Sequence, residues 1–287
     1  PIGDNASNIH DNYIDEGRIL TATEAIDQYY YSKIGERESV KSDNKITDSM
    51  HRRDLRNYGK WLEIDRQLSE VYKNPSTALL SLRVSRDVQG RVSLIEELYQ
   101  AFDKMLNSLR RWIEVKDWEF VAVFAGTENY ATPHVHMYII SDGDLNPSVF
   151  QKSVKKFARV CQYSSSNCKG NRPEDGAVRI MGNGSDSIPR RNEDRVSAGM
   201  LYTLTQLPHI RKVENMTQAE LLHGSTVRAW DGGQHFRQSR YSLDEGEEEA
   251  ANVTGSKLRT QCNQEHFSFT DYTSSFEFSV EQSFSLG

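Results

Sequence analysis

The sequence contains little cysteine and no long apolar run. Its three cysteines, Cys161, Cys168 and Cys262, are too few and unpaired in number for a disulfide framework. No stretch approaches the roughly 20 apolar residues that cross a bilayer. The start of the chain also lacks the basic and apolar segments of a secretion signal. We therefore expect a cytoplasmic protein that makes no contact with a membrane.

An excess of positive charge is also missing. Lys and Arg number 35 against 41 Asp and Glu, which gives a formal net charge of -6. This balance argues against a protein that coats DNA through bulk electrostatics, because such binding needs a positive surface. A local basic track remains compatible with it. With 287 residues, the chain is long enough for one large domain or two small ones.

Three regions differ in the periodicity of their apolar residues. Residues 1–75 are expected to be a helical N-terminal region, either packed on the main domain or separate from it. One face of its longest helix carries Trp61, Ile64, Leu68 and Val71. Residues 76–210 alternate between strand and helix patterns and are expected to form the main domain. Residues 211–287 are expected to be a C-terminal region that is partly flexible.

The pattern of residues 76–210 predicts an α+β fold. Strands are expected at 77–85, 118–125, 134–140 and 178–181, the second and third joined as a hairpin. Helices are expected at 95–112, 147–161 and 194–207. This order predicts a mainly antiparallel sheet flanked by helices, similar to split βαβ folds.

The segment from Pro133 to Tyr138 reads Pro-His-Val-His-Met-Tyr. Residues two apart on a strand point to the same side, so His134 and His136 present two imidazoles together. Neutral histidine is the commonest protein ligand for a divalent metal. We therefore treat the two histidines as candidate metal ligands, although ordinary strand histidines show the same spacing.

Tyr202 is the candidate nucleophile. Its predicted helix buries Val196, Met200, Leu204 and Leu207, whereas Tyr202 lies about 200° round the helix from Met200. Most helical tyrosines bury the ring and hydrogen-bond the hydroxyl, and Tyr202 is one of 13 tyrosines in the chain. The position of Tyr202 becomes informative only in combination with the histidine pair.

The combination resembles the HUH family of rolling-circle replication initiators. These have an apolar strand with Ser or Thr, a His-apolar-His strand and a helical tyrosine in that order. The corresponding residues here are Leu79 to Leu82, His134 to His136, and Tyr202. Residues 58–82, 125–136, 198–202 and 230–241 resemble initiators of haloarchaeal plasmids and viruses. The resemblance implies an HUH/RRM-like split βαβ fold and an endonuclease.

The chemistry that the resemblance implies is nicking and joining of single-stranded DNA at a replication origin, through a 5′-phosphotyrosine at Tyr202. His134 and His136 would hold Mn²⁺ or Mg²⁺. Many relatives add a carboxylate where this chain has Gly126, so Glu128 is the candidate third ligand. Gln206 stands where relatives place a second tyrosine or a lysine, which implies a single-tyrosine enzyme. A host polymerase and helicase are the expected partners.

Basic residues near these motifs are candidate DNA contacts, since phosphates are bound by Lys and Arg. They fall into two groups. Arg83 lies on the first strand and Arg190, Arg191 and Arg195 lie before and within the tyrosine helix. A stripe on the helix at 147–161 consists of Lys152, Lys155, Lys156 and Arg159.

Two other functions fit parts of the pattern. A non-catalytic origin-binding or DNA-packaging protein could share the fold. A histidine-triad nucleotide hydrolase carries a third histidine on the same strand, and Tyr138 occupies that position here. A covalent DNA–protein adduct separates the endonuclease from both.

Overall fold

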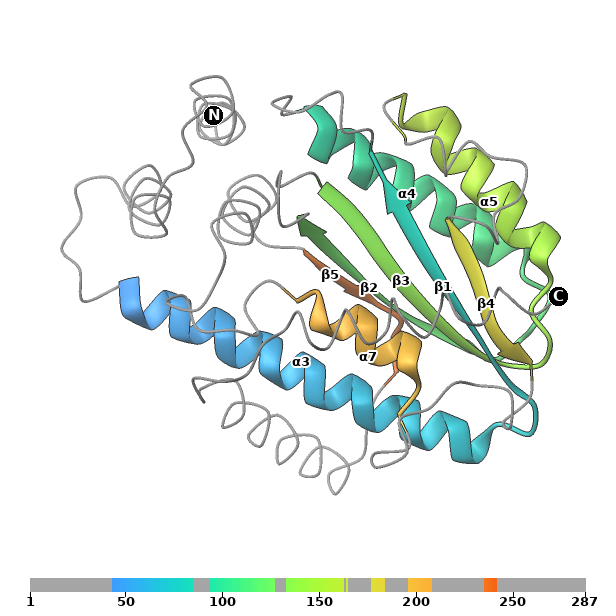
Figure 1. Ribbon diagram of the computed structural model, residues 1–287, viewed down its shortest axis with the longest axis horizontal. Helices are drawn as coiled ribbons and strands as arrows, with labels where there is room; N and C mark the ends of the chain where they lie inside the picture. The colour runs from blue at the N-terminus through green and yellow to red at the C-terminus, as the bar shows by residue number, and fades with distance from the viewer. Residues whose placement is uncertain are drawn as a thin grey trace, which may run out of the picture.

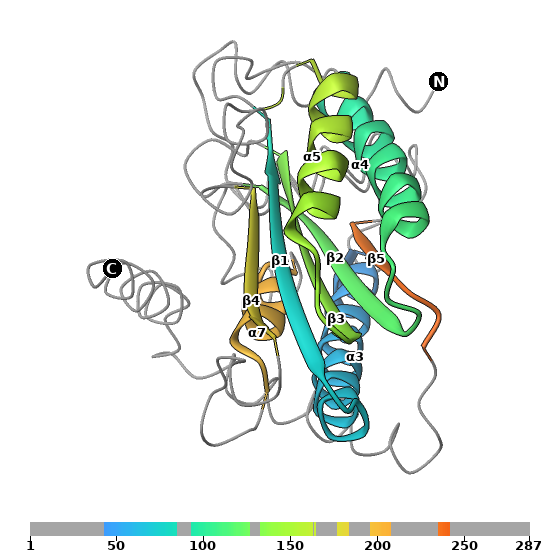
Figure 2. The ribbon, with the colours of Figure 1, turned by 90° about the vertical axis from the view of Figure 1, so that its right-hand side faces the viewer.

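The structure is a computed structural model that describes residues 43–84, 93–126, 133–162, 164, 177–183, 196–207 and 235–241. Within these residues, five strands form one antiparallel sheet in the order β4-β1-β3-β2-β5. Four helices of the described residues flank this sheet on its two faces (Figures 1 and 2). The α+β fold and the antiparallel sheet predicted from the sequence are confirmed.

The central strands are β1 (Pro75–Arg83), β3 (Pro133–Asp142) and β2 (Trp118–Gly126). β2 and β3 pair antiparallel, so the predicted hairpin is confirmed. β3 also pairs antiparallel with β1, which places Ser81 opposite His136 and Arg83 opposite His134. The histidine pair therefore lies on a strand that has neighbours on both sides.

One face of the sheet is covered by α4 (Ser93–Trp112) and α5 (Pro147–Val160). Asn146 caps α5, because its side chain accepts a hydrogen bond from the Ser148 backbone N–H at 3.0 Å. These helices bury their apolar stripes against alternate residues of β1, β2 and β3. Trp112, the last residue of α4, is 38% exposed.

The other face is covered by α3 (Asp43–Val71) and α7 (Ala198–Thr205). Trp61, Ile64 and Leu68 are buried against this face, as their spacing predicts. Val71 is not, and its 72% exposure corrects the sequence prediction. The helix ends at Val71, and Tyr72 packs against the apolar cluster instead.

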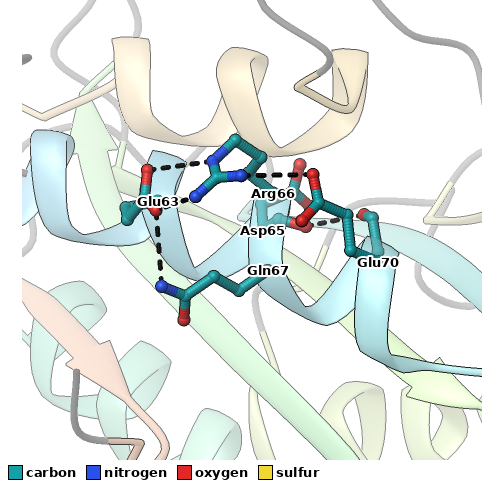
Figure 3. Close-up of polar contacts among 6 residues, drawn as sticks. Glu63, Asp65, Arg66, Gln67 and Glu70 are labelled. Carbon is teal, nitrogen blue, oxygen red and sulfur yellow. Dashed lines mark hydrogen bonds and ion pairs between the residues drawn. The ribbon is translucent and has the colours of Figure 1, made fainter. Parts of the chain in front are cut away.

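The outer side of α3 carries charged residues that pair with each other. Arg66 bonds to Glu63 and Glu70, three and four residues away (Figure 3). Glu63 and Glu70 both raise the pKa of Arg66. Pairs this close to solvent contribute at most about 1 kcal/mol each. The helix is therefore held on the sheet by its inner side.

Two features of the fold were not expected from the sequence. Residues 236–238 form a short strand, β5 (Phe236–Gln238), on the outer edge of β2. α7 begins at Ala198 rather than near 194, and Ser197 caps it. β4 (Val178–Asn183) was expected and closes the other edge of the sheet. Among the described residues, no helix combines the length and the apolar character that crossing a bilayer requires.

Candidate active site at the histidine pair of β3

His134 and His136 lie side by side on the face of the sheet that α3 and α7 cover. Their ring centroids are 4.6 Å apart and the ring planes are nearly perpendicular, at 81°. Only 5% of His134 and 1% of His136 is exposed. The alternation that predicts a shared side for the two imidazoles is confirmed, and their strand is paired on both sides.

The environment of His136 keeps its imidazole neutral. Burial lowers the pKa of His136 well below its usual value near 6.5, and the charges of His134 and Arg83 lower it further. Nδ1 of His136 lies 3.0 Å from the Ser81 hydroxyl on β1. A serine that accepts the Nδ1 proton leaves the lone pair on Nε2, which is the form that binds a metal.

Tyr202 completes this group of side chains from α7. Its hydroxyl lies 3.5 Å from Nε2 of His136, and the two ring centroids are 4.8 Å apart. The phenol and the imidazole come from positions 66 residues apart in the sequence. At this distance the contact is longer than an ordinary hydrogen bond. The phenol therefore faces the imidazole without being locked to it.

The histidine pair offers two imidazoles as nitrogen donors for a divalent metal. In the part of the chain that the structure describes, no group of three or more His, Cys, Asp or Glu side chains could hold such an ion. Glu128, the expected third ligand, lies outside the described residues. Two adjacent imidazoles, one of them kept neutral and tied through its far nitrogen, fit the donor set that Mn²⁺ accepts.

The expected DNA contacts differ in where they lie. Arg83 faces His134 across the β1–β3 pairing and is exposed, so it stands next to the site. Arg190, Arg191 and Arg195 lie outside the described residues. The stripe on α5 is at least partly exposed but belongs to the helix layer on the opposite face of the sheet (Figure 1). Its members are Lys152, Lys155, Lys156 and Arg159.

Buried polar residues around the site were not expected from the sequence. Asp65 of α3 bonds to Tyr138 and Ser197, and Asp54 of α3 bonds to His235, at 3.1 Å from its Nε2. Both aspartates lie on the helix side that is otherwise apolar. A charged residue on the apolar face of a helix was the available signal, because such a group is stable there only with partners.

Comparison with known proteins found no match among family models, curated proteins or solved structures. The side chains gathered on β3 and α7 are therefore the basis for assigning a function.

Proposed function

We propose that this protein is an HUH-type endonuclease, which nicks and rejoins single-stranded DNA through Tyr202 and initiates rolling-circle replication of a plasmid or virus genome. The observation that carries the proposal is the 3.5 Å separation between the Tyr202 hydroxyl and Nε2 of His136. It brings a nucleophile to the ring nitrogen of His136 that does not contact Ser81 and would face a metal. The adjacent His134 ring supports the same assignment.

The sheet topology supports the finer fold assignment, a split βαβ fold of the HUH/RRM type. The strands β4, β1, β3 and β2 lie side by side in this order and are antiparallel. α4 connects β1 to β2 and α5 connects β3 to β4 along the chain. Two βαβ units that interleave in this way give the ferredoxin-like arrangement. α3 and α7 cover the face that carries the site.

Tyr202 would perform the strand transfer. A free tyrosine has a pKa of about 10, so its hydroxyl is a poor nucleophile until it loses its proton. The phenol oxygen forms a bond to phosphorus while the bond from phosphorus to the 3′ oxygen breaks. The 3′ oxygen takes up a proton, and a host polymerase can extend the resulting hydroxyl. The phosphotyrosine retains the energy of the phosphodiester, so the reverse reaction rejoins the strand without ATP.

His134 and His136 would hold Mn²⁺ or Mg²⁺, with Glu128 as the proposed third ligand. When bound there, such a cation would supply Lewis-acid stabilisation of the negative charge that develops on the scissile phosphate. His136 stays neutral because burial disfavours the imidazolium. Ser81 fixes the orientation of the His136 ring from the neighbouring strand. Arg83, which lies opposite His134 in the β1–β3 register, would hold a phosphate beside the histidine pair.

The partners follow from the chemistry. The substrate is single-stranded DNA at an origin, because a buried pair of imidazoles cannot reach a phosphate within an intact duplex without distortion of the DNA. Supercoiling or a host helicase would unwind the origin. Both host enzymes act in the cytoplasm of a prokaryotic cell, which is the proposed location.

The two alternatives make different predictions. A histidine-triad hydrolase requires an imidazole at position 138, where this chain has Tyr138, whose hydroxyl donates to Asp65 at 2.9 Å. An origin-binding or packaging protein would bind DNA without reacting with it. Neither alternative explains why Tyr202 faces the histidine pair.

The experiment is a search for a covalent adduct. Labelled single-stranded oligonucleotides, including a pool of random sequences and hairpins, are incubated with the protein and Mn²⁺ or Mg²⁺ and run on a denaturing gel. We expect an adduct that EDTA prevents and that is weak with linear duplex. His134→Ala and His136→Ala should abolish the adduct and leave the circular dichroism spectrum unchanged. Released nucleotide would support the hydrolase, and binding without adduct would support the non-catalytic protein.

A further inference from the structure

A buried carboxylate joins three elements behind the candidate site. Asp65 of α3 has no exposed surface and accepts three hydrogen bonds. The donors are the Tyr138 hydroxyl at 2.9 Å, the Ser197 backbone N–H at 2.8 Å and the Ser197 hydroxyl at 2.9 Å. The hydroxyl oxygens of Ser197 and Tyr138 are also 2.6 Å apart. Asp65 thus connects α3 and β3 to the first turn of α7.

These bonds fix the start of α7. Ser197 is the N-cap of this helix, and its hydroxyl accepts from the Met200 backbone N–H at 3.4 Å. A negative carboxylate at the N-terminus of a helix is stabilised by the helix dipole. α7 has eight residues. A helix this short is not stable alone, so its position depends on its tertiary contacts.

The residue spacing along α7 and β3 explains why the bonds of Asp65 to Ser197 and Tyr138 affect the position of Tyr202. Tyr202 follows Ser197 by five residues, which is about 7.5 Å along an α-helix. His136 and Tyr138 are two residues apart and share one side of β3, which is about 6.8 Å along a strand. Because the two lengths nearly match, holding Ser197 at Tyr138 brings Tyr202 level with His136.

We propose that Asp65 is a positioning residue for the nucleophile: it fastens Ser197 to Tyr138 and so sets the Tyr202 hydroxyl against His136. This role rests on the proposed function for its effect on DNA nicking. The positioning itself is a property of the fold. Asp65 bonds to Ser197 and Tyr138, and we assign its effect on Tyr202 to these two residues.

The cost of burying a charge supports this role over simple packing. Burial of an ionised carboxylate costs several kcal/mol, which hydrogen bonds to the charge only partly offset. The surrounding side chains of α3, including Trp61, Ile64 and Leu68, are apolar and fully or nearly fully buried. An apolar residue at position 65 would pack in this cluster without that cost. The carboxylate adds directional bonds, which an apolar side chain cannot supply.

The test uses the full chain and three variants. Asp65→Asn keeps the shape of the side chain but replaces one accepting oxygen with an NH₂ group, which faces hydrogen-bond donors of Ser197 and Tyr138. Ser197→Thr retains the hydroxyl and the backbone N–H and is the conservative rescue. Val154→Ala, in α5 on the opposite face, is the control for a general loss of stability. If Asp65→Asn fails to fold, Tyr138→Phe removes one donor and keeps the ring.

Two measurements are made on each variant. The first is an NMR cross-relaxation peak between the ring protons of Tyr202 and His136, whose centroids are 4.8 Å apart. The second is kcat and KM for adduct formation with a single-stranded oligonucleotide. For Asp65→Asn we expect the peak to disappear, kcat to fall about 10- to 100-fold, and KM to change less than about twofold. Ser197→Thr and Val154→Ala should keep both.

The two proposals fail in distinguishable ways. If the wild-type chain forms no adduct, the nuclease proposal fails and the NMR peak alone decides the positioning role. A peak and a kcat that both persist in Asp65→Asn overturn the positioning role, whatever the wild type does. Equal losses in Val154→Ala also overturn it, because they would show an effect of stability. A fall in kcat with the peak intact would place Asp65 outside the positioning of Tyr202.

Discussion

The two faces of the sheet differ in what they bury. On the face covered by α4 and α5 the contacts are apolar, and its buried Ser108 and Ser153 donate to carbonyls of their own helices. On the face covered by α3 and α7, buried polar side chains join segments far apart in sequence. Asp65 reaches position 197, for example, and Asp54 reaches position 235.

This difference separates stability from orientation. Apolar burial is proportional to area and has no preferred direction, so it holds a fold together without fixing a particular hydroxyl. Hydrogen bonds to buried groups require specific geometry and fix orientation. We therefore expect substitutions on the α4/α5 face to change the free energy of unfolding, and those on the α3/α7 face to change the reaction.

The largest effect is expected from Tyr202→Phe. Removal of the hydroxyl removes the nucleophile, so adduct formation should be lost completely. The free energy of unfolding should change by less than about 1 kcal/mol, because the contact of the hydroxyl to His136 is longer than an ordinary hydrogen bond. The matched control is Tyr99→Phe, a buried tyrosine stacked on Phe124 on the other face. Loss of adduct in that control would remove the distinction between the faces.

The converse substitution is Leu109→Ala in α4. Leu109 is fully buried in the apolar cluster, and its truncation should lower the free energy of unfolding by about 2–5 kcal/mol. The rate of adduct formation per folded molecule should stay within about twofold of the wild type. Urea unfolding and adduct formation at low temperature measure the two quantities. A large fall in rate for the folded fraction would count against the comparison.

A smaller effect is expected from substitution of Ser81, the β1 residue whose hydroxyl contacts the His136 ring. Ser81→Ala removes the partner of Nδ1 of His136 and should weaken binding of Mn²⁺ by about 10- to 100-fold. Titration calorimetry with Mn²⁺ measures this without DNA. Ser81→Thr retains a hydroxyl and should restore most of the affinity. Equal affinity in the alanine variant would show that Ser81 does not orient the ring.

The smallest effect concerns pH. Because burial lowers the pKa of His136 below 6.5, the unfolded chain takes up a proton in the window below pH 6.5 where the folded chain does not. Falling pH therefore destabilises the fold by at most about 1.4 kcal/mol per pH unit for this group. The decrease in the free energy of unfolding between pH 7.5 and pH 5.5 should be smaller in His136→Asn than in the wild type. Denaturant unfolding at both pH values, with EDTA present, measures this free energy. Identical decreases in the wild type and the variant would contradict a lowered pKa of His136.

Much of the α4/α5 face could be predicted from the sequence. Apolar residues alternate along β1 and recur about every 3.6 residues along α4, because each element buries one side. The period of the apolar residues therefore predicts both elements. The side-by-side placement of His134 and His136 follows from the same rule. A pattern of this kind fails only at element ends, as it does at Val71, where the helix stops.

The rest of the α3/α7 face depends on tertiary contacts that no local pattern encodes. β5 is three residues long and exists because β2 offers it an open edge. The start of α7 is set by Ser197, whose partner Asp65 lies 132 residues earlier. The meeting of Tyr202 with His136 was inferred from the family resemblance, and spacing in the sequence alone could not give it.

The central claim is that Tyr202 attacks the phosphate. The most direct measurement is to trap the adduct with a single-stranded oligonucleotide, digest both components and identify the modified peptide by mass spectrometry. The account predicts a nucleotide joined through its 5′-phosphate to Tyr202. A nucleotide attached to another tyrosine or to a histidine, with Tyr202 unmodified, would contradict it.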